Sequence, residues 1–203
     1  MIRAVQLYTF MQYCSESPLE KEILECGAGG WPDFEPLFVR FYQEGYQVHG
    51  IEISAERLAF AQEYCANNNI PADLREADMQ QLPYPDASLS FVFSYNAIFH
   101  MRKSEISASV AEIERVLKPG GLCFINFLSI NDHRYGEGQE IAPGEFIQDE
   151  GGGQTVHTYY KDDEAEAHFT NFGILFKEKR TLWRTWNDSL IRQGYIDYIS
   201  RKN

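Results

Sequence analysis

The stretch ILECGAGGWP (residues 23–32) joins a short apolar run to an acid and a glycine-rich turn. A second stretch, VHGIEIS (residues 48–54), again places an acid at the end of an apolar run. Each stretch predicts a buried strand that leads through a turn into a helix. In an open parallel sheet, the carboxyl ends of such strands line the crevice that binds nucleoside-like ligands. We therefore expect Glu25 and Glu52 to lie at the edge of one ligand site.

The glycine turn and the second acid fit the two ends of such a ligand. Gly27 and Gly29 allow a tight turn and a close approach of the backbone to a ligand. Glu52 is placed to accept hydrogen bonds from both ribose hydroxyls, as the acid after the second strand does in Rossmann-type sites. A glycine turn alone is a weak signal, but a turn followed by an acid at βαβ spacing is more specific.

Three further segments follow in the chain: EADMQQLPYPD (76–86), LSFVFSYNAIFHM (89–101) and EIERVLKPGGL (112–122). With the two stretches above, they resemble the class I S-adenosylmethionine-dependent methyltransferases, in the compact type 11-like form of the domain. The resemblance covers five segments in the family's order and spacing, up to about residue 128. It implies S-adenosyl-L-methionine as the cofactor and S-adenosyl-L-homocysteine as the product.

The alternation of apolar runs and helical patterns predicts an α/β doubly wound sheet. The family resemblance implies a Rossmann-like, mostly parallel, seven-stranded sheet with helices on both faces. It also implies the strand order 3-2-1-4-5-7-6, in which the last-inserted strand is antiparallel. We expect a single domain over residues 1–203, with a helical cap in residues 1–20.

The patterns predict seven strands, at residues 22–26, 47–52, 72–76, 89–94, 122–128, 173–183 and 194–200. They predict helices at residues 2–14, 32–44, 103–117 and 162–169, and one that begins after Ser54 and ends at residues 67–69. Residues 131–157 are rich in glycine, proline and charge. A long irregular segment of this kind predicts a lid over a binding site.

The resemblance assigns cofactor contacts residue by residue. Glu25, Gly27 and Gly29 would hold the methionine end of the cofactor, and the backbone carbonyl of Ser94 would face its ammonium group. Glu52 would take the ribose hydroxyls. The adenine would contact the following residues: Ile53, Asp78 and Met79. Each acid also has a purely structural interpretation, as a helix cap or as a turn residue.

The sequence departs from the family pattern at two places. The third glycine of the usual G-x-G-x-G is Trp31 here, preceded by Gly30, so the contacts of a third glycine are open. The usual Phe-Asp of the fourth strand is replaced by Ser90-Phe91. That second position is more often structural, and we expect cofactor binding to survive the change.

Catalytic residues are less well defined, because methyl transfer needs a base only when the acceptor must lose a proton. His100 follows the fourth strand, near the expected acceptor, and is the first candidate to orient or deprotonate it. Tyr95 is the second candidate. His100 has an equally good structural interpretation as a loop histidine held by a hydrogen bond, and Tyr95 has one as the end of its strand.

Composition limits the partners. The net charge of −12 argues against nonspecific nucleic-acid binding. Cysteine, histidine and acid spacings match no ligand pattern, so the sequence predicts no metal site. No apolar run is long enough to span a bilayer, and no secretory pattern opens the sequence. We expect a cytoplasmic monomer or homodimer that meets no membrane.

The sequence favours transfer of a methyl group to an O, N or S atom of a small molecule by in-line displacement. A sterol or quinone acceptor is less expected, because no basic amphipathic membrane face is apparent. Two alternatives remain open. The chain could be a non-enzymatic scaffold that binds the cofactor, or, with less support, a nicotinamide-dependent oxidoreductase.

Overall fold

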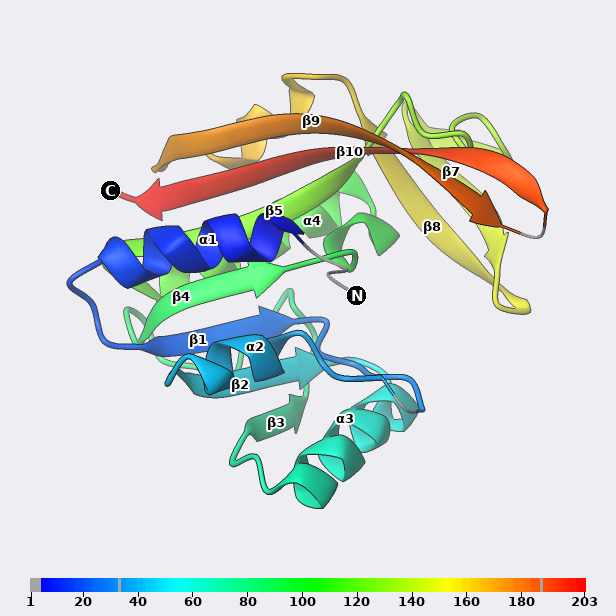
Figure 1. Cartoon of the computed structure of the whole chain (residues 1–203). Helices are drawn as coiled ribbons and strands as arrows, with labels where there is room; N and C mark the ends of the chain where they lie inside the picture. Colours follow the sequence, from blue (N-terminus) through cyan, green and yellow to red (C-terminus); the bar gives the residue numbers. More distant parts are fainter. Residues whose placement is uncertain (1–4, 33, 187) are drawn as a thin grey trace.

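A parallel sheet forms the centre of the molecule (Figure 1). The computed structural model describes residues 5–32, 34–186 and 188–203. Five parallel strands lie in the order β3-β2-β1-β4-β5. They are β1 (Glu22–Cys26), β2 (Gln47–Glu52), β3 (Asp73–Glu76), β4 (Leu89–Ser94) and β5 (Leu117–Ser129). The strand order reverses between β1 and β4, and the crevice at such a point is where open α/β sheets bind ligands.

A long antiparallel hairpin extends the sheet beyond β5. It consists of β9 (Phe172–Trp186) and β10 (Ser189–Lys202), and β10 pairs antiparallel with β5. The predicted α/β doubly wound fold is confirmed. The strand order differs from the prediction in detail: the path β3-β2-β1-β4-β5-β10-β9 is present, but the sheet has ten strands, because β8-β7-β6 also joins the end of β5.

The segment 131–157 is not irregular, and this part of the prediction is wrong. It holds β6 (Gln139–Ala142), β7 (Glu145–Glu150) and most of β8 (Gly153–Tyr160), which pair antiparallel with one another. Gly144, between β6 and β7, has a φ of +79°, and Gly151 and Gly152, between β7 and β8, have φ of +59° and +90°. The glycines that suggested a loop therefore occupy hairpin turns. Whether this unit closes over a ligand stays a prediction.

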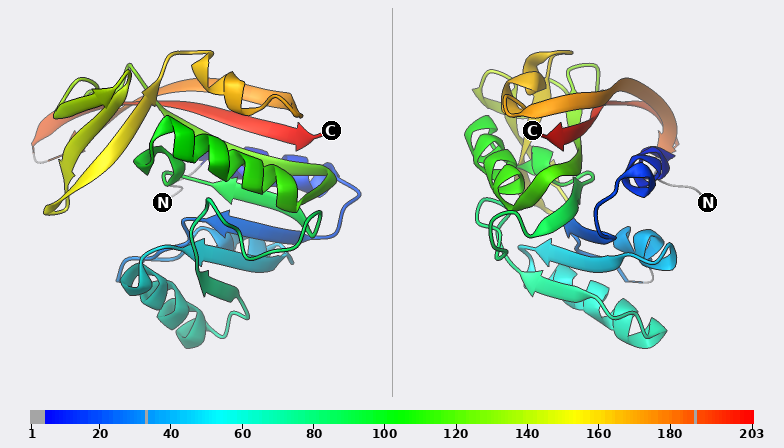
Figure 2. Two further views of the ribbon diagram at one scale, coloured as in Figure 1. Left: turned by 180° about the vertical axis from the view of Figure 1, so that it is seen from behind. Right: turned by 90° about the vertical axis from the view of Figure 1, so that its left-hand side faces the viewer.

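Helices cover both faces of the sheet (Figure 2). On one face lie α1 (Val5–Glu16), α2 (Phe38–Gln43) and α3 (Ala55–Asn68). On the other lie α4 (Lys103–Val116) and the short 3₁₀ helix η2 (Glu164–His168), which replaces the predicted helix 162–169. A second 3₁₀ helix, η1 (Ile98–His100), follows β4. Residues 1–4 of the predicted cap lie outside the described residues.

Helix α2 begins at Phe38 rather than at Pro32 as predicted. Pro36 disfavours a helical conformation in Glu35, the residue before it. The Phe38 N–H, at the first turn of α2, donates to Oε2 of Glu25 at 2.9 Å. The position where this helix begins is therefore tied to the acid at the end of β1.

Two hydrophobic cores fill the space between the sheet and its helices, and β4 is buried along its whole length. A smaller core holds β7, β8 and β10 against η1; it consists of Phe99, Leu128, Phe146, Tyr159 and Tyr195. All four cysteines are free and buried. In the part of the chain that the structure describes, no helix has the length and apolarity needed to cross a membrane.

A buried ion pair joins β9 to β10. The Arg180 guanidinium donates to both carboxylate oxygens of Asp197, and Asp197 is fully buried. On the same strand, Lys179 makes an exposed ion pair with Asp162.

Arg180→Ala should destabilise the protein by about 3–5 kcal/mol, because it leaves the Asp197 carboxylate buried without its cation. The matched control, Lys179→Ala, should cost less than about 1 kcal/mol, because exposed pairs contribute little. Urea unfolding of the three proteins measures both values. Equal losses in the two variants would contradict this account of the hairpin.

Candidate functional site

The glycine turn after β1 is fastened to the end of β2. The backbone N–H groups of Gly27 and Ala28 both donate to the Ile51 carbonyl, at 2.9 and 2.8 Å. Gly27 has a φ of +85°, and a Cβ there would lie 2.4 Å from the Cβ of Ala97, in the loop after β4. Only glycine meets both conditions. The turn thus brings the ends of β1, β2 and β4 together.

The Glu52 carboxylate is held at the end of β2 by two backbone groups. Its Oε2 accepts from the Gly29 N–H at 3.0 Å, and its Oε1 accepts from the Ser54 N–H at 2.9 Å. Each carboxylate oxygen has a second lone pair, so the group keeps acceptor capacity for a ligand. A Cβ on Gly29 would lie 2.4 Å from Oε2. Gly29 is therefore required by the position of this carboxylate.

The residues predicted to meet an adenine lie beside Glu52. The Ala77 N–H donates to the Glu52 carbonyl at 3.1 Å, which anchors the segment after β3 to the end of β2. Asp78 follows, and its Oδ1 accepts from the Gln80 N–H at 2.8 Å. Met79 is buried in the core, whereas Ile53 is 68% exposed. Ile53 thus offers an apolar surface next to Glu52 on which a flat ring can pack.

Glu25 and Ser94 are buried at the ends of the two central strands. Burial raises the pKa of Glu25 to about 8, and the Phe38 N–H lowers it to a smaller extent. Glu25 pairs in register with Phe93, the residue before Ser94. The Ser94 hydroxyl is buried, with no hydrogen-bond partner among the described residues. The Ser94 hydroxyl without a partner and the Glu25 carboxyl are polar groups that fit the polar end of a ligand, such as the methionine end of S-adenosylmethionine.

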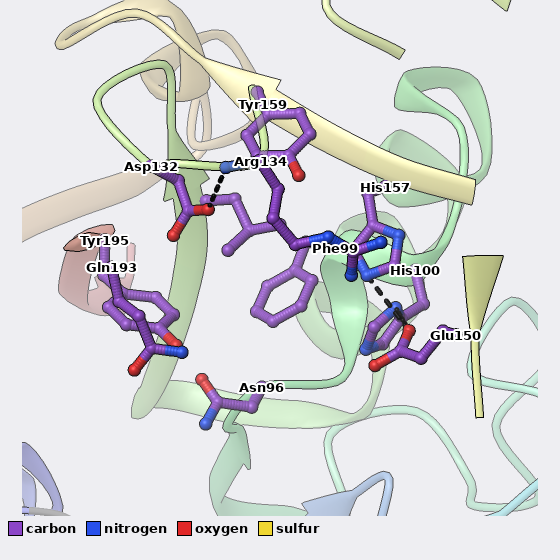
Figure 3. A pocket seen from close by; sticks show the side chains of 11 residues that line it. Asn96, Phe99, His100, Asp132, Arg134, Glu150, His157, Tyr159, Gln193 and Tyr195 are labelled. Carbon is purple, nitrogen blue, oxygen red and sulfur yellow. Dashed lines mark hydrogen bonds and ion pairs between the residues drawn. The ribbon is translucent and has the colours of Figure 1, made fainter. Parts of the chain in front are cut away.

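A cavity of about 240 Å³ lies beyond the end of β4 (Figure 3). His100 lines this cavity from η1. The other lining residues are Asn96, Phe99, Leu128, Asp132, Arg134, Glu150, His157, Tyr159, Gln193 and Tyr195. Tyr95 instead packs with its ring stacked on Phe124, at 6.1 Å between centroids. The structure thus brings one of the two catalytic candidates to the cavity.

His100 lies beside a second histidine and an acid. Its Nδ1 is 3.7 Å from Oε2 of Glu150, and the Nε2 of His157 is 3.0 Å from the same oxygen. Burial lowers the pKa of His100 to about 4, so its imidazole is neutral near pH 7. The contact with His157 lowers the pKa of Glu150 to about 2. A neutral imidazole and a carboxylate therefore face the cavity together.

Two asparagines brace the loop that carries the cavity. Asn126 Oδ1 accepts from the Asn96 N–H, and Asn126 Nδ2 donates to Asn96 Oδ1, both at 2.7 Å. Asn96 has a φ of +56°, a conformation that asparagine tolerates better than most residues. Sequence reasoning missed this pair, and it missed Glu150 as well. The only signal was the polar Asn126 within the apolar fifth strand.

Trp31, which replaces the third glycine, does not enter the turn. It is 57% exposed, and the Arg57 guanidinium of α3 lies 4.6 Å from its ring centroid. The turn closes without it, because the Gly30 N–H donates to the Arg57 carbonyl at 2.9 Å. Trp31 at the third glycine position is therefore accommodated outside the turn, where it contacts Arg57 of α3.

This arrangement of sheet, turn and acids is that of a nucleoside-cofactor enzyme, and the comparisons identify the family. Residues 24–125 match the family of the methyltransferase domain. The chain belongs to the S-adenosylmethionine-dependent methyltransferase family.

Curated relatives carry different activities. The chain is 30% identical over 155 residues to a 27-O-demethylrifamycin SV methyltransferase of Amycolatopsis mediterranei, covering 75% of the chain and 53% of that protein. It is 28% identical over 182 residues to a sterol 24-C-methyltransferase of Pneumocystis carinii, covering 87% of the chain and 45% of that protein. The chain thus spans about half the length of these two relatives.

Solved structures agree on the fold. A SAM-dependent methyltransferase from Methanosarcina mazei superposes with a TM-score of 0.77 at 20% identity, covering 100% of this chain and 98% of that one. TehB from Haemophilus influenzae gives a TM-score of 0.70 at 11% identity, covering 98% and 62%. A 1,6-didemethyltoxoflavin-N1-methyltransferase of Burkholderia thailandensis, solved with S-adenosylhomocysteine, gives 0.66 at 12% identity, covering 98% and 76%.

Gly29→Ala should weaken binding of S-adenosylhomocysteine at least tenfold, because the new Cβ displaces the Glu52 carboxylate. Gly30→Ala is the matched control in the same turn. A Cβ there would lie 3.2 Å from the Ala61 nitrogen and far from Glu52, so we expect a smaller loss. Isothermal titration calorimetry measures both affinities. Equal affinity of Gly29→Ala and the native protein would contradict the role of this contact.

The raised pKa of Glu25 predicts a pH dependence of stability. Its pKa rises from about 4.5 to about 8 on folding. The protonated carboxyl therefore stabilises the fold below pH 4.5, and this contribution is lost as the pH rises through about 8. The native protein should lose on the order of a few kcal/mol more than Glu25→Gln over this range. Denaturant unfolding of both proteins at several pH values measures the difference. Parallel curves would show that Glu25 is not buried as described.

Proposed function

We propose that this chain transfers the methyl group of S-adenosyl-L-methionine to an O, N or S atom of a small molecule, by in-line displacement, and releases S-adenosyl-L-homocysteine. The observation that carries the proposal is the Glu52 carboxylate, fixed by two backbone N–H groups with acceptor capacity left over. It lies at the ends of the parallel strands, where the family's cofactor binds.

The proposed cofactor contacts follow the strand ends. Glu52 takes the ribose hydroxyls, and the adenine packs on Ile53, with Asp78 and Met79 at its edge. Glu25, with the backbone of Gly27 and Gly29, holds the methionine end, and the Ser94 carbonyl faces the ammonium group. The hydrogen bond from the Ala77 N–H to the Glu52 carbonyl supports this division, because it holds the segment of Asp78 and Met79 next to Glu52.

The proposed acceptor site is the cavity lined by His100. Its volume of about 240 Å³ lies below the usual range of about 300–1,000 Å³ for ligand pockets, which supports a small acceptor over one of sterol size. The net charge of −12 supports a small molecule over a nucleic acid. We propose a cytoplasmic monomer or homodimer for the same protein.

Methyl transfer requires mainly that the methyl donor and the acceptor are aligned. The acceptor atom attacks the methyl carbon as the bond from that carbon to sulfur breaks, and the positive charge on sulfur disappears. Holding both partners in line supplies several kcal/mol of the barrier reduction. His100 is neutral near pH 7, so it can orient an acceptor hydroxyl or take its proton. Tyr95 remains a candidate on the acceptor side, because it precedes Asn96 of the cavity wall.

Binding of S-adenosylhomocysteine tests the cofactor half of the proposal. At about a hundredfold over the dissociation constant, a native-state ligand adds roughly 2.7 kcal/mol, which raises the melting temperature by several degrees. Glu52→Ala should abolish the shift. Glu56→Ala, an exposed acid in the first turn of α3, should keep it. A shift with NADH alone would contradict the proposal in favour of an oxidoreductase.

Transfer of a labelled methyl group tests the other half. The native protein, given labelled cofactor and a pool of small metabolites, should label at least one of them, and Glu52→Ala should not. Tight cofactor binding without any labelled product would instead support the scaffold alternative.

A further inference from the structure

Among the described residues, one cluster brings together two imidazoles and a carboxylate. The cluster consists of His100 of η1, Glu150 at the end of β7 and His157 of β8, and one ligand atom from each lies within 4.8 Å of the others. Figure 3 shows the three side chains pointing toward one another at one wall of the cavity. The three come from elements that are distant in sequence or separated by a hairpin turn, so only the fold assembles them.

The distances suit a shared cation. Zinc binds histidine nitrogen and carboxylate oxygen at about 2.0–2.2 Å, which places neighbouring ligand atoms of a tetrahedron roughly 3.3–3.6 Å apart. The two distances from Oε2 of Glu150, 3.0 Å to His157 and 3.7 Å to His100, bracket that range. The ligand atoms of the three residues all lie within 4.8 Å of one another, so the widest pair would have to approach by up to about 1.2 Å to reach tetrahedral spacing.

The hydrogen bonding of the histidine nitrogens in the cluster also suits a bound cation. The Nδ1 of His100 is buried and has no hydrogen-bond partner in the part of the chain described. His157 is 4% exposed; its Nε2 faces Oε2 of Glu150 at 3.0 Å, and its Nδ1 has no hydrogen-bond partner there. Buried polar atoms without partners are rare enough to need an explanation.

A second group of one histidine and two acids, around His49, differs from this cluster in its geometry. His49 also contacts two acids, but Asp73 lies 3.3 Å from its Nδ1 and Glu22 lies 3.2 Å from its Nε2. The two acids approach opposite nitrogens of one ring, so no single point is close to all three groups. At His100 and His157, by contrast, two separate rings converge on one carboxylate oxygen.

The charged side chains near the cluster include one that opposes a bound cation and one that favours it. Arg134 lines the same cavity and opposes a cation, but its guanidinium is engaged by the Asp149 carbonyl at 2.8 Å and by Glu137 at 3.4 Å. Asp132 lines the cavity opposite and adds a negative charge. These charges lead us to expect moderate rather than very tight binding.

We propose that His100, Glu150 and His157 form a site for one divalent transition-metal cation at the wall of the cavity. Two imidazoles and one carboxylate are a donor set that zinc and related cations accept, and three protein ligands leave coordination positions open. The sequence predicted no metal site, because the spacing of its histidines and acids matches no ligand pattern; the proposal rests on the fold, which brings these three residues together. A further consequence rests on the proposed function: with His100 bound to the cation, an open coordination position, in place of the free imidazole, would take an oxygen of the acceptor and lower the pKa of a bound hydroxyl. The class of acceptor would then be a hydroxyl compound, methylated on oxygen.

The test is a titration of the chelator-treated, dialysed protein with Co²⁺, followed by its visible absorption, with no cofactor or acceptor present. The native protein should bind one Co²⁺ per chain with the intense bands of four- or five-coordinate cobalt. His100→Gln, Glu150→Gln and His157→Gln should each weaken binding at least tenfold. The control, His133→Gln, removes a histidine whose Nδ1 contacts the Arg192 carbonyl, and it should bind as the native protein does.

Two results would overturn the proposal: no saturable binding by the native protein, or binding that survives all three substitutions. Glu150 is a half-exposed side chain, so Glu150→Gln keeps the test decisive if the histidine variants fail to fold. The cobalt titration needs no methyl transfer, so a protein that binds no cobalt would contradict the metal site without contradicting the proposed cofactor site. Conversely, a protein that does not bind S-adenosylhomocysteine would contradict the proposed function without contradicting the metal site.

Discussion

The contact on which the proposed cofactor site depends is the pair of hydrogen bonds from the Gly29 and Ser54 N–H groups to the Glu52 carboxylate. It links the turn after β1 to the start of α3, so two neighbouring strand ends share one anion. The absence of a side chain on Gly29 is what allows the carboxylate to lie there. Similar backbone hydrogen bonds place the neighbouring elements. The Ala77 N–H donates to the Glu52 carbonyl, and the Phe38 N–H, in the first turn of α2, donates to the Glu25 carboxyl group.

The two halves of the site are built by different means. The parallel strands β1, β2 and β4 supply the proposed cofactor side, through the acids and glycines at or after their carboxyl ends. The antiparallel unit β6–β8 contributes Glu150, His157 and Tyr159 to the wall of the cavity. A small aromatic core joins this unit to η1 and β10, and the Asn96–Asn126 pair braces the loop between the halves. Under the proposed function, the acceptor specificity could therefore change without disturbing the strand ends proposed to hold the cofactor.

The parallel half could be predicted from the sequence because its signals are local. Strands 22–26, 47–52 and 89–94 are apolar runs bounded by turns, and Ser54 is an N-cap that the structure confirms. The unit β6–β8 was predicted as irregular, because its strands are short and charged, and its turn glycines look like loop composition. The cluster of His100, Glu150 and His157 has no sequence pattern at all. Hairpin pairing and the position of η1 create it, and neither can be inferred from spacing.

The central claim is that one cofactor lies across the ends of β1, β2 and β4 with its reactive carbon directed at the cavity of His100. A crystal structure of the complex with S-adenosylhomocysteine tests it most directly. The account predicts the ribose hydroxyls on Glu52, the adenine on Ile53 and Asp78, and the sulfur facing the cavity. A ligand bound elsewhere, or a sulfur turned away from the cavity wall that His100 forms, would contradict it.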